Sequence, residues 1–155
     1  MSGGSTHSPG PAFLLAQIGA HAAARFTERL GPLGLTPSEA GVLWNLSHQP
    51  DLTQRALAEH LGAFPSRVVL LLDALEQKGL VKRNRGSVDR RSHVLRLTSA
   101  GRTLLGELSK IARQHQDDLC AALTHGERDQ LRTLLAKIAD EQGLRARAHP
   151  GFRKA

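Results

Sequence analysis

The stretch from Gln54 to Asp73, QRALAEHLGAFPSRVVLLLD, carries the pattern that decides the fold. Ala58 is small enough for two helices to cross closely, and Gly62, four residues later, can adopt the positive φ of a tight turn. The apolar contacts between the two helices are expected from Leu57, Leu61, Val68 and Leu71. An ordinary helical hairpin needs only the apolar spacing. The small residue and the glycine at these positions therefore favour a helix-turn-helix.

The hydrophobic period changes after this motif. Residues 80–83 (LVKR) and 93–97 (HVLRL) alternate apolar and basic side chains, and the residues between them are polar. This pattern predicts two strands around a long turn, that is, a β-hairpin. A helix-turn-helix followed by a basic hairpin is a winged helix-turn-helix, which we expect over about residues 36–98.

Further helices are predicted on both sides of this unit. Apolar residues recur at helical spacing from Leu14 to Leu30, and Gly31-Pro32 ends that helix. Residues 36–39 (TPSE) form a capping-box pattern that opens a helix through Leu46, and Thr53 can cap a helix that ends near Leu61. A helix from about Pro65 to Lys78 follows.

Two more helices are expected after the hairpin. Thr98 can cap a long helix, and a second capping-box pattern, Thr124 to Glu127, starts the last one. The apolar residues of this last helix are spaced i, i+3, i+4 and i+7 and are Leu131, Leu134, Leu135 and Ile138. The fold class is therefore mainly α with a small β-hairpin wing.

Composition narrows the class of protein. The chain has 155 residues, of which 40% are hydrophobic and 23% are charged, as in an ordinary globular domain. No apolar run approaches the ~20 residues of a membrane span, and residues 1–11 lack the positive charge of a secretory signal. A single cysteine, Cys120, fits a reducing compartment, so we expect a cytoplasmic protein. Residues 1–10 are expected to be a disordered leader, and residues 143–155 a basic flexible tail.

The positive charge is concentrated in one window. Between Lys78 and Arg102 lie eight basic residues and one acid, Asp89, so this window carries the whole net charge of +7. A dense basic segment on a balanced body predicts a site for a polyanion, since phosphate contacts need concentrated charge. A solvated charged hairpin is the alternative that charge alone leaves open.

Four segments, TPSEAGVLWNL, LTQRALAEHLG, LDALEQKGLVKR and DRRSHVLRLTSAGRTLL, together resemble the MarR family of bacterial transcriptional regulators. The resemblance covers roughly residues 12–142 and implies a MarR-like domain over residues 11–142. It implies a homodimer joined through helices in residues 11–31 and 98–142. The second helix of the motif is then expected in the major groove of double-stranded DNA, at a pseudo-palindromic operator, with the wing tip in a neighbouring minor groove. Members of this family often bind operators that overlap promoters, so the resemblance implies that the protein is a repressor.

One departure from the family concerns this second helix. The family usually presents polar residues to the bases, whereas the residues that face DNA on the template are Phe64, Pro65, Ser66, Val69 and Leu70, with Arg67 adjacent. Ser66 is the one hydrogen-bonding side chain among those five. Apolar groups can pack on thymine methyls but discriminate less than bidentate contacts, so DNA shape is expected to contribute to recognition. Alternatively, Val69 and Leu70 extend the core.

The wing residues divide by their expected contact. Asp89 can pair with Arg90 or Arg91 and hold the hairpin tip, which frees the other arginine for a narrow minor groove. The resemblance supports an inserted arginine in this segment, and we expect it to be Arg90. Arg83 and Arg85 are expected on phosphates, which orient the protein without reading sequence.

Family members are often released from DNA by small aromatic acids or phenolic compounds bound between the dimerisation helices and the DNA-binding unit. The residues that could line such a crevice are His21, Arg25, Phe26, Trp44, His48 and His115. An arginine or histidine beside aromatic rings suits an apolar anion. In the alternative, Trp44 and Phe26 belong to the core, and His21 and His48 lie on the surface.

Other chemistry is weakly supported. The eight histidines form no His-x-x-x-His pair and join no acidic cluster, so no metal or cofactor is expected. Cys120 lacks the tyrosine partners of peroxide sensors, and we expect it to be a buried inert thiol. The sequence contains neither a nucleophile motif nor a phosphate-binding glycine loop, so no motif in it indicates an enzyme. Two alternatives remain open, a nucleoid-type architectural DNA-binding protein without effector and a protein-interaction adaptor that has lost DNA binding.

Overall fold

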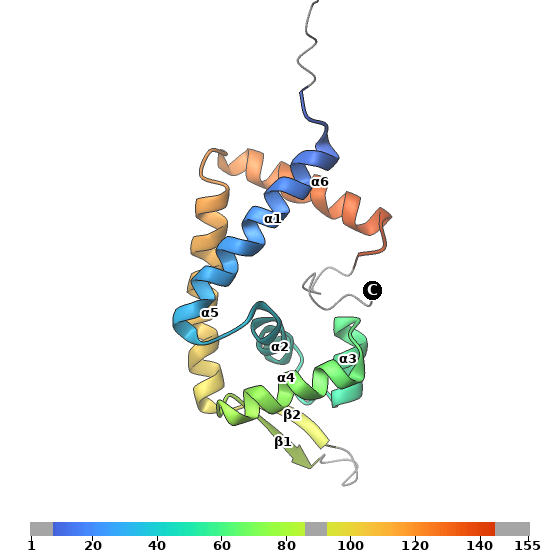
Figure 1. Cartoon of the computed structure of the whole chain (residues 1–155), viewed down its shortest axis with the longest axis vertical. Helices are drawn as coiled ribbons and strands as arrows, with labels where there is room; N and C mark the ends of the chain where they lie inside the picture. The colour runs from blue at the N-terminus through green and yellow to red at the C-terminus, as the bar shows by residue number, and fades with distance from the viewer. Residues whose placement is uncertain (1–7, 86–92, 145–155) are drawn as a thin grey trace, which may run out of the picture.

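A computed structural model of the chain describes residues 8–85 and 93–144, which form six α-helices, one short 3-10 helix and a two-stranded sheet (Figure 1). The elements in order are α1 (Pro11–Leu30), η1 (Gly31–Leu33), α2 (Pro37–His48), α3 (Gln54–Leu61), α4 (Pro65–Gln77), β1 (Val81–Arg85), β2 (His93–Leu97), α5 (Ser99–Leu119) and α6 (His125–Glu141). This order confirms the mainly helical fold class with one hairpin. Helix α2 runs two residues further than predicted, and Cys120 follows α5 and is partly exposed rather than buried.

Four threonines start helices as their positions predicted. Thr36 and Thr124 each complete a capping box with the glutamate three residues later. The side chains of Thr53 and Thr98 accept hydrogen bonds from Ala56 N and Gly101 N. Such caps satisfy backbone N–H groups that the helix itself leaves unpaired. Gly62 ends α3 with a φ of 61°, as the tight turn of the motif requires.

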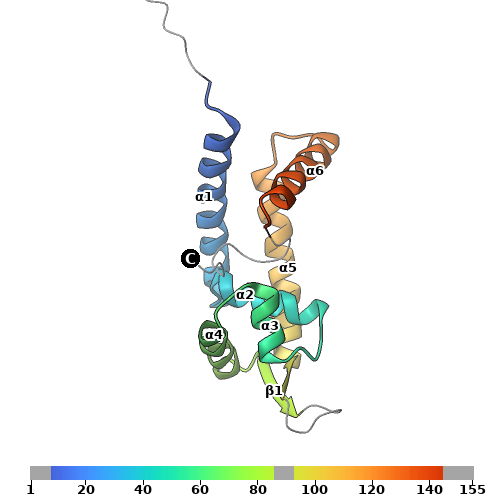
Figure 2. The same cartoon turned by 90° about the vertical axis from the view of Figure 1, so that its right-hand side faces the viewer.

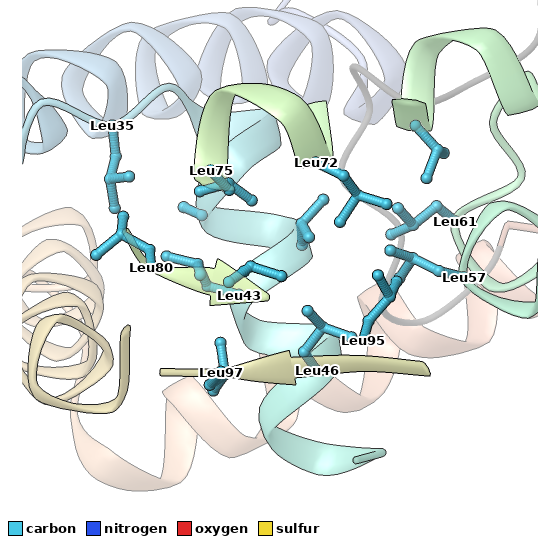
Figure 3. Packing of buried hydrophobic residues seen from close by; sticks show 14 of the residues in the cluster. Leu35, Leu43, Leu46, Leu57, Leu61, Leu72, Leu75, Leu80, Leu95 and Leu97 are labelled. Atoms are coloured by element: carbon cyan, nitrogen blue, oxygen red, sulfur yellow. The ribbon is translucent and has the colours of Figure 1, made fainter. Parts of the chain in front are cut away.

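The core lies between α2, α3, α4 and the hairpin, which we call the winged unit (residues 36–98). Figure 3 shows leucines from all of these elements meeting in one cluster, including Leu43, Leu57, Leu72 and Leu95. Strands β1 and β2 pair antiparallel, with Val81 opposite Leu97 and Arg85 opposite His93. The alternation along each strand directs Val81, Leu95 and Leu97 into the core.

Helices α1 and α6 lie on the side of the winged unit opposite the hairpin, and α5 runs from the hairpin to α6; we call these three helices the platform (Figure 2). Helix α6 buries none of its residues within this chain. The large apolar residues that the platform and the segment after α6 expose are Phe13, Leu14, Leu15, Ile18, Leu119, Leu131, Leu134, Leu135, Ile138 and Leu144. None of the helices in residues 8–85 and 93–144 has the length and apolarity to cross a membrane.

The platform and the wing meet closely at the start of α5. The backbone N–H of Thr98 donates to the carbonyl of Leu80 at 3.0 Å, and its hydroxyl donates to the carbonyl of Gly79 at 2.6 Å. A Cβ at Gly101 would lie 2.1 Å from that same Leu80 oxygen. Glycine is therefore required at this position for the first turn of α5 to rest against the base of the hairpin.

One carboxylate is buried in the winged unit. Glu39, 4% exposed, accepts a hydrogen bond from the ammonium of Lys78 at 2.7 Å and another from Thr36 N at 2.8 Å. Lys78 also donates to the carbonyl of Gly34 at 2.7 Å. Burial by itself raises the pKa of Glu39, but the hydrogen bonds from Lys78 and Thr36 and the charge of Lys78 outweigh it, so this pKa lies below its ordinary value.

This lowered pKa predicts how stability depends on pH. A carboxyl group that binds its proton more weakly in the folded state stabilises that state above its ordinary pKa of 4.5, and loses this contribution as the pH falls through the folded pKa. The difference in unfolding free energy between wild type and Glu39→Gln should be largest near pH 7 and shrink below pH 4.5. Urea denaturation from pH 7 to below pH 4 measures it, and a difference that stays constant with pH would contradict the prediction.

Candidate nucleic-acid interface

Helix α4 turns one face to the core and the other to solvent. Val68, Leu72 and Leu75 are fully buried, whereas Leu70 is 70% exposed. Val69 is half-buried. The structure therefore rejects the alternative in which Leu70 extends the core, and Val69 is not among the residues packed against that core.

The first turn of α4 has the charge and exposure expected of a DNA contact. Pro65, Ser66 and Arg67 are exposed, and the first turn contains no acidic residue. Phe64, at the N-cap, is 54% exposed. The positive end of the helix dipole favours a phosphate here. The DNA contacts of these residues stay a prediction.

Arg83 on β1 reaches across to α4. Its guanidinium lies 2.8 Å from the carboxylate of Asp73 and also binds the carboxylate of Glu76, which accepts the backbone N–H of Arg83 at 3.0 Å. The side chain of Arg83 is only 23% exposed. A phosphate contact by Arg83 stays a prediction, but the geometry favours another role, that of holding the hairpin against α4. Sequence reasoning missed these two carboxylate partners.

The other wing residues are less constrained. Arg85 is exposed and lies two residues from Arg83 on β1, so both belong to the same face of the strand. Lys82 is exposed on the opposite face. Asp89, Arg90 and Arg91 fall outside the described residues, so the minor-groove contact expected of Arg90 stays a prediction.

The six candidate ligand residues fall into two groups. Trp44 and His48 stack with ring centroids 5.9 Å apart, and they line a cleft of about 470 Å³ between α2 and α5. The residues that complete this cleft are Ser47, Leu105, Ser109, Ala112, Arg113 and Gln116. Arg113 was missed by sequence reasoning, because only the packing of α5 on α2 brings it beside Trp44.

The second group lies where α1 packs on α5. Phe26 contacts His115 with ring centroids 5.3 Å apart, and Arg29 forms an ion pair with Asp118 beside them. Burial and the charge of Arg29 lower the pKa of His115, and Arg25 and His21 are close enough to add to this effect. Arg25 is paired with Glu28 at 3.0 Å on the exposed surface of α1. These six residues, expected together in one crevice, are thus distributed in the structure over two separate contacts of α5.

Metal ligands do not gather in the described part of the chain. Within residues 8–85 and 93–144, no group of three or more histidine, cysteine, aspartate or glutamate side chains is arranged to hold an ion.

Comparisons with known proteins agree with this architecture. The MarR family model matches residues 35–93, which cover most of the winged unit. The transcriptional repressor CouR, solved bound to a 23-mer DNA duplex, is 35% identical, with a TM-score of 0.77 over 90% of this chain and 99% of that chain. A MarR-family protein of Mycobacterium tuberculosis, solved in complex with DNA, is 28% identical, with a TM-score of 0.73 over 84% of this chain and 98% of that one.

A curated relative extends the likeness to regulators. A protein of Thauera aromatica, whose name assigns it to transcriptional regulation of the hcr operon, is 32% identical over 105 residues, or 68% of this chain. The chain spans 63% of the length of that relative. Because the family model covers most of the winged unit and a repressor with 35% identity matches over 99% of its own length, this chain belongs to the MarR family of winged helix-turn-helix transcriptional regulators.

Proposed function

We propose that the protein is a homodimeric, sequence-specific regulator that binds double-stranded DNA in the cytoplasm and represses transcription. The observation that carries the proposal is the exposed outer face of α4 beside a basic hairpin, in a chain that matches a DNA-bound repressor over 90% of its length. The protein acts by binding rather than by catalysis. In this arrangement α4 enters the major groove, and the wing contacts the flanking backbone.

The exposed apolar face of the platform supports a dimer. Leu134 is 52% exposed and Ile138 is 46% exposed on a helix that buries nothing within its own chain. A contiguous apolar surface of this kind marks an association site. A two-fold dimer would place two copies of α4 about one DNA turn apart, ~34 Å, which matches a pseudo-palindromic operator.

A charge placed in this face should dissociate the dimer. Leu134→Asp is expected to give a monomer in sedimentation at micromolar concentration, and to lose operator binding with it. The fold of the winged unit should persist, since Leu134 lies outside the core. Thr133→Asp adds the same charge on the opposite face of α6 and serves as the control. A wild-type chain that sediments as a monomer would contradict the proposal.

The cleft between α2 and α5 supports a small-molecule switch. Trp44 offers an apolar wall, and Arg113 and His48 offer partners for a carboxylate. We therefore place a small aromatic or phenolic acid in this cleft. Since the cleft joins the platform to the winged unit, a ligand that fits it better in one arrangement of the two would shift the population away from the DNA-bound state.

A titration of aromatic carboxylates into the protein–DNA complex tests this site. Arg113→Ala should require about tenfold more ligand for release, because it removes one charge-assisted hydrogen bond. Arg25→Ala, which removes a cation near His115 at the contact between α1 and α5, is the matched control and should release DNA at wild-type concentrations. Equal release by wild type and Arg113→Ala would remove the ligand from this cleft, and an effect of Arg25→Ala alone would place it at the other group.

Footprinting on random-sequence and upstream DNA separates the proposal from its alternatives. A regulator protects a discrete, nearly palindromic site, whereas an architectural protein coats DNA with little preference. An adaptor that has lost DNA binding would show no salt-sensitive affinity for any duplex.

A further inference from the structure

The solvent-facing stripe of α4 has an apolar residue at its centre. Residues spaced i, i+4, i+7 and i+11 share one helix face, and here they are Ser66, Leu70, Asp73 and Gln77. Asp73 is bound to Arg83. Leu70 lies at the centre of the stripe, and its side chain cannot form a hydrogen bond with a base.

The exposure of Leu70 is large for its chemistry. At 70%, it exceeds that of the other exposed large apolar residues of the described chain, among them Phe13 at 60% and Phe64 at 54%. The buried face of α4 is complete without it, since Val68, Leu72 and Leu75 are fully buried. An apolar side chain that is exposed on a helix contributes favourable free energy only when a partner covers it and removes it from water.

The charges near Leu70 indicate what that partner is. The first turn of α4 carries Arg67 and no acid, and exposed Lys82 and Arg85 lie on the neighbouring strand. The two carboxylates of α4, Asp73 and Glu76, are both paired with Arg83, which offsets one of their two negative charges. An apolar side chain on a surface that also exposes cations complements a partner that combines phosphates with apolar groups, and in duplex DNA the exposed apolar group of the major groove is the thymine methyl.

We infer that Leu70 determines sequence preference by packing on the 5-methyl group of a thymine in each half-site. This inference rests on the proposed function and names the chemical feature that α4 recognises. Specificity at that base pair then comes from covering the methyl group rather than from a bidentate hydrogen bond.

Uracil replacement in the DNA isolates this contact. The binding site is first selected from a pool of random duplexes with wild-type protein. Each thymine of the enriched site is then replaced in turn by uracil, which pairs identically but lacks the methyl group. Affinities are measured by fluorescence anisotropy at one fixed salt concentration for wild type, Leu70→Ala and Ser66→Ala.

One thymine per half-site should be sensitive. Loss of its methyl should weaken wild-type binding about fourfold, and about 15-fold when both half-sites are changed. Leu70→Ala should bind the thymine and uracil duplexes equally, whereas Ser66→Ala, on the same stripe, should keep the wild-type penalty. Alanine is a good helix former, and the side chain of Leu70 is exposed, so this variant should keep its circular dichroism spectrum.

The possible results distinguish the thymine contact of Leu70 from sequence-specific DNA binding itself. An enriched site whose uracil versions all bind wild type equally would overturn the thymine contact and leave the proposed function intact. A penalty that persists in Leu70→Ala would assign the methyl contact to another residue. A pool in which no sequence is enriched would remove sequence-specific binding itself, and Leu70 would then be a contact for a protein partner.

Discussion

Replacement of Gly101 by alanine should lower the free energy of unfolding by about 3 kcal/mol, although alanine is ordinarily favoured over glycine inside a helix. The added Cβ would lie 2.1 Å from the backbone oxygen of Leu80. That oxygen cannot retreat cheaply, because it accepts the N–H of Thr98, the cap of the same helix. The wing base and the start of α5 would have to separate.

Gly106 on the same helix provides the control. A Cβ at Gly106 meets nothing within 4 Å, so Gly106→Ala should raise the free energy of unfolding by up to about 1 kcal/mol. The two variants make the same chemical change and should move the urea midpoint in opposite directions. A midpoint that rises in both would show that the contact between Gly101 and Leu80 does not constrain the fold.

Removal of Arg83 should weaken operator binding about 100-fold. Arg83→Met keeps the apolar stem but leaves Asp73 and Glu76 without their cation, on the helix that approaches the phosphates. Like charges brought together at an interface cost several kcal/mol, and about 1.4 kcal/mol for each carboxylate gives the 100-fold loss. The hairpin would also lose its link to α4.

A triple variant distinguishes this masking role from the phosphate contact that the sequence suggested. If Arg83 acts by offsetting the negative charge of Asp73 and Glu76, then Arg83→Met combined with Asp73→Asn and Glu76→Gln should recover most of the affinity in a gel shift. If Arg83 instead binds a phosphate, the triple variant should stay as weak as Arg83→Met alone.

The features that the sequence predicted well are local in the chain. The threonine caps, the glycine turn of the motif and the strand alternation each depend on residues within a few positions of one another. Trp44 and His48 are four residues apart on one helix, so their contact also follows from spacing.

The features that the sequence did not predict depend on packing between distant elements. Arg83 meets Asp73 because β1 folds back along α4, and basic composition alone gives no sign of that partner. Arg113 lines the cleft only because α5 packs against α2. The predicted crevice combined residues of α1, α2 and α5 by chemical type, whereas α5 meets α1 through His115 and Asp118 and meets α2 through other side chains, among them Arg113.

Because Leu80 lies so close to the start of α5, a movement of this helix is transmitted to the hairpin. Helix α5 has 21 residues and is therefore about 31 Å long. If α5 tilted by about 6° about the end that leads to α6, its other end, at the hairpin, would move by about 3.3 Å, close to the spacing of one base pair. Because the backbone N–H and the hydroxyl of Thr98 tie the base of the hairpin to the start of α5, the hairpin would follow this tilt rather than absorb it. A change too small to alter the fold would thus shift the wing by one step along the duplex.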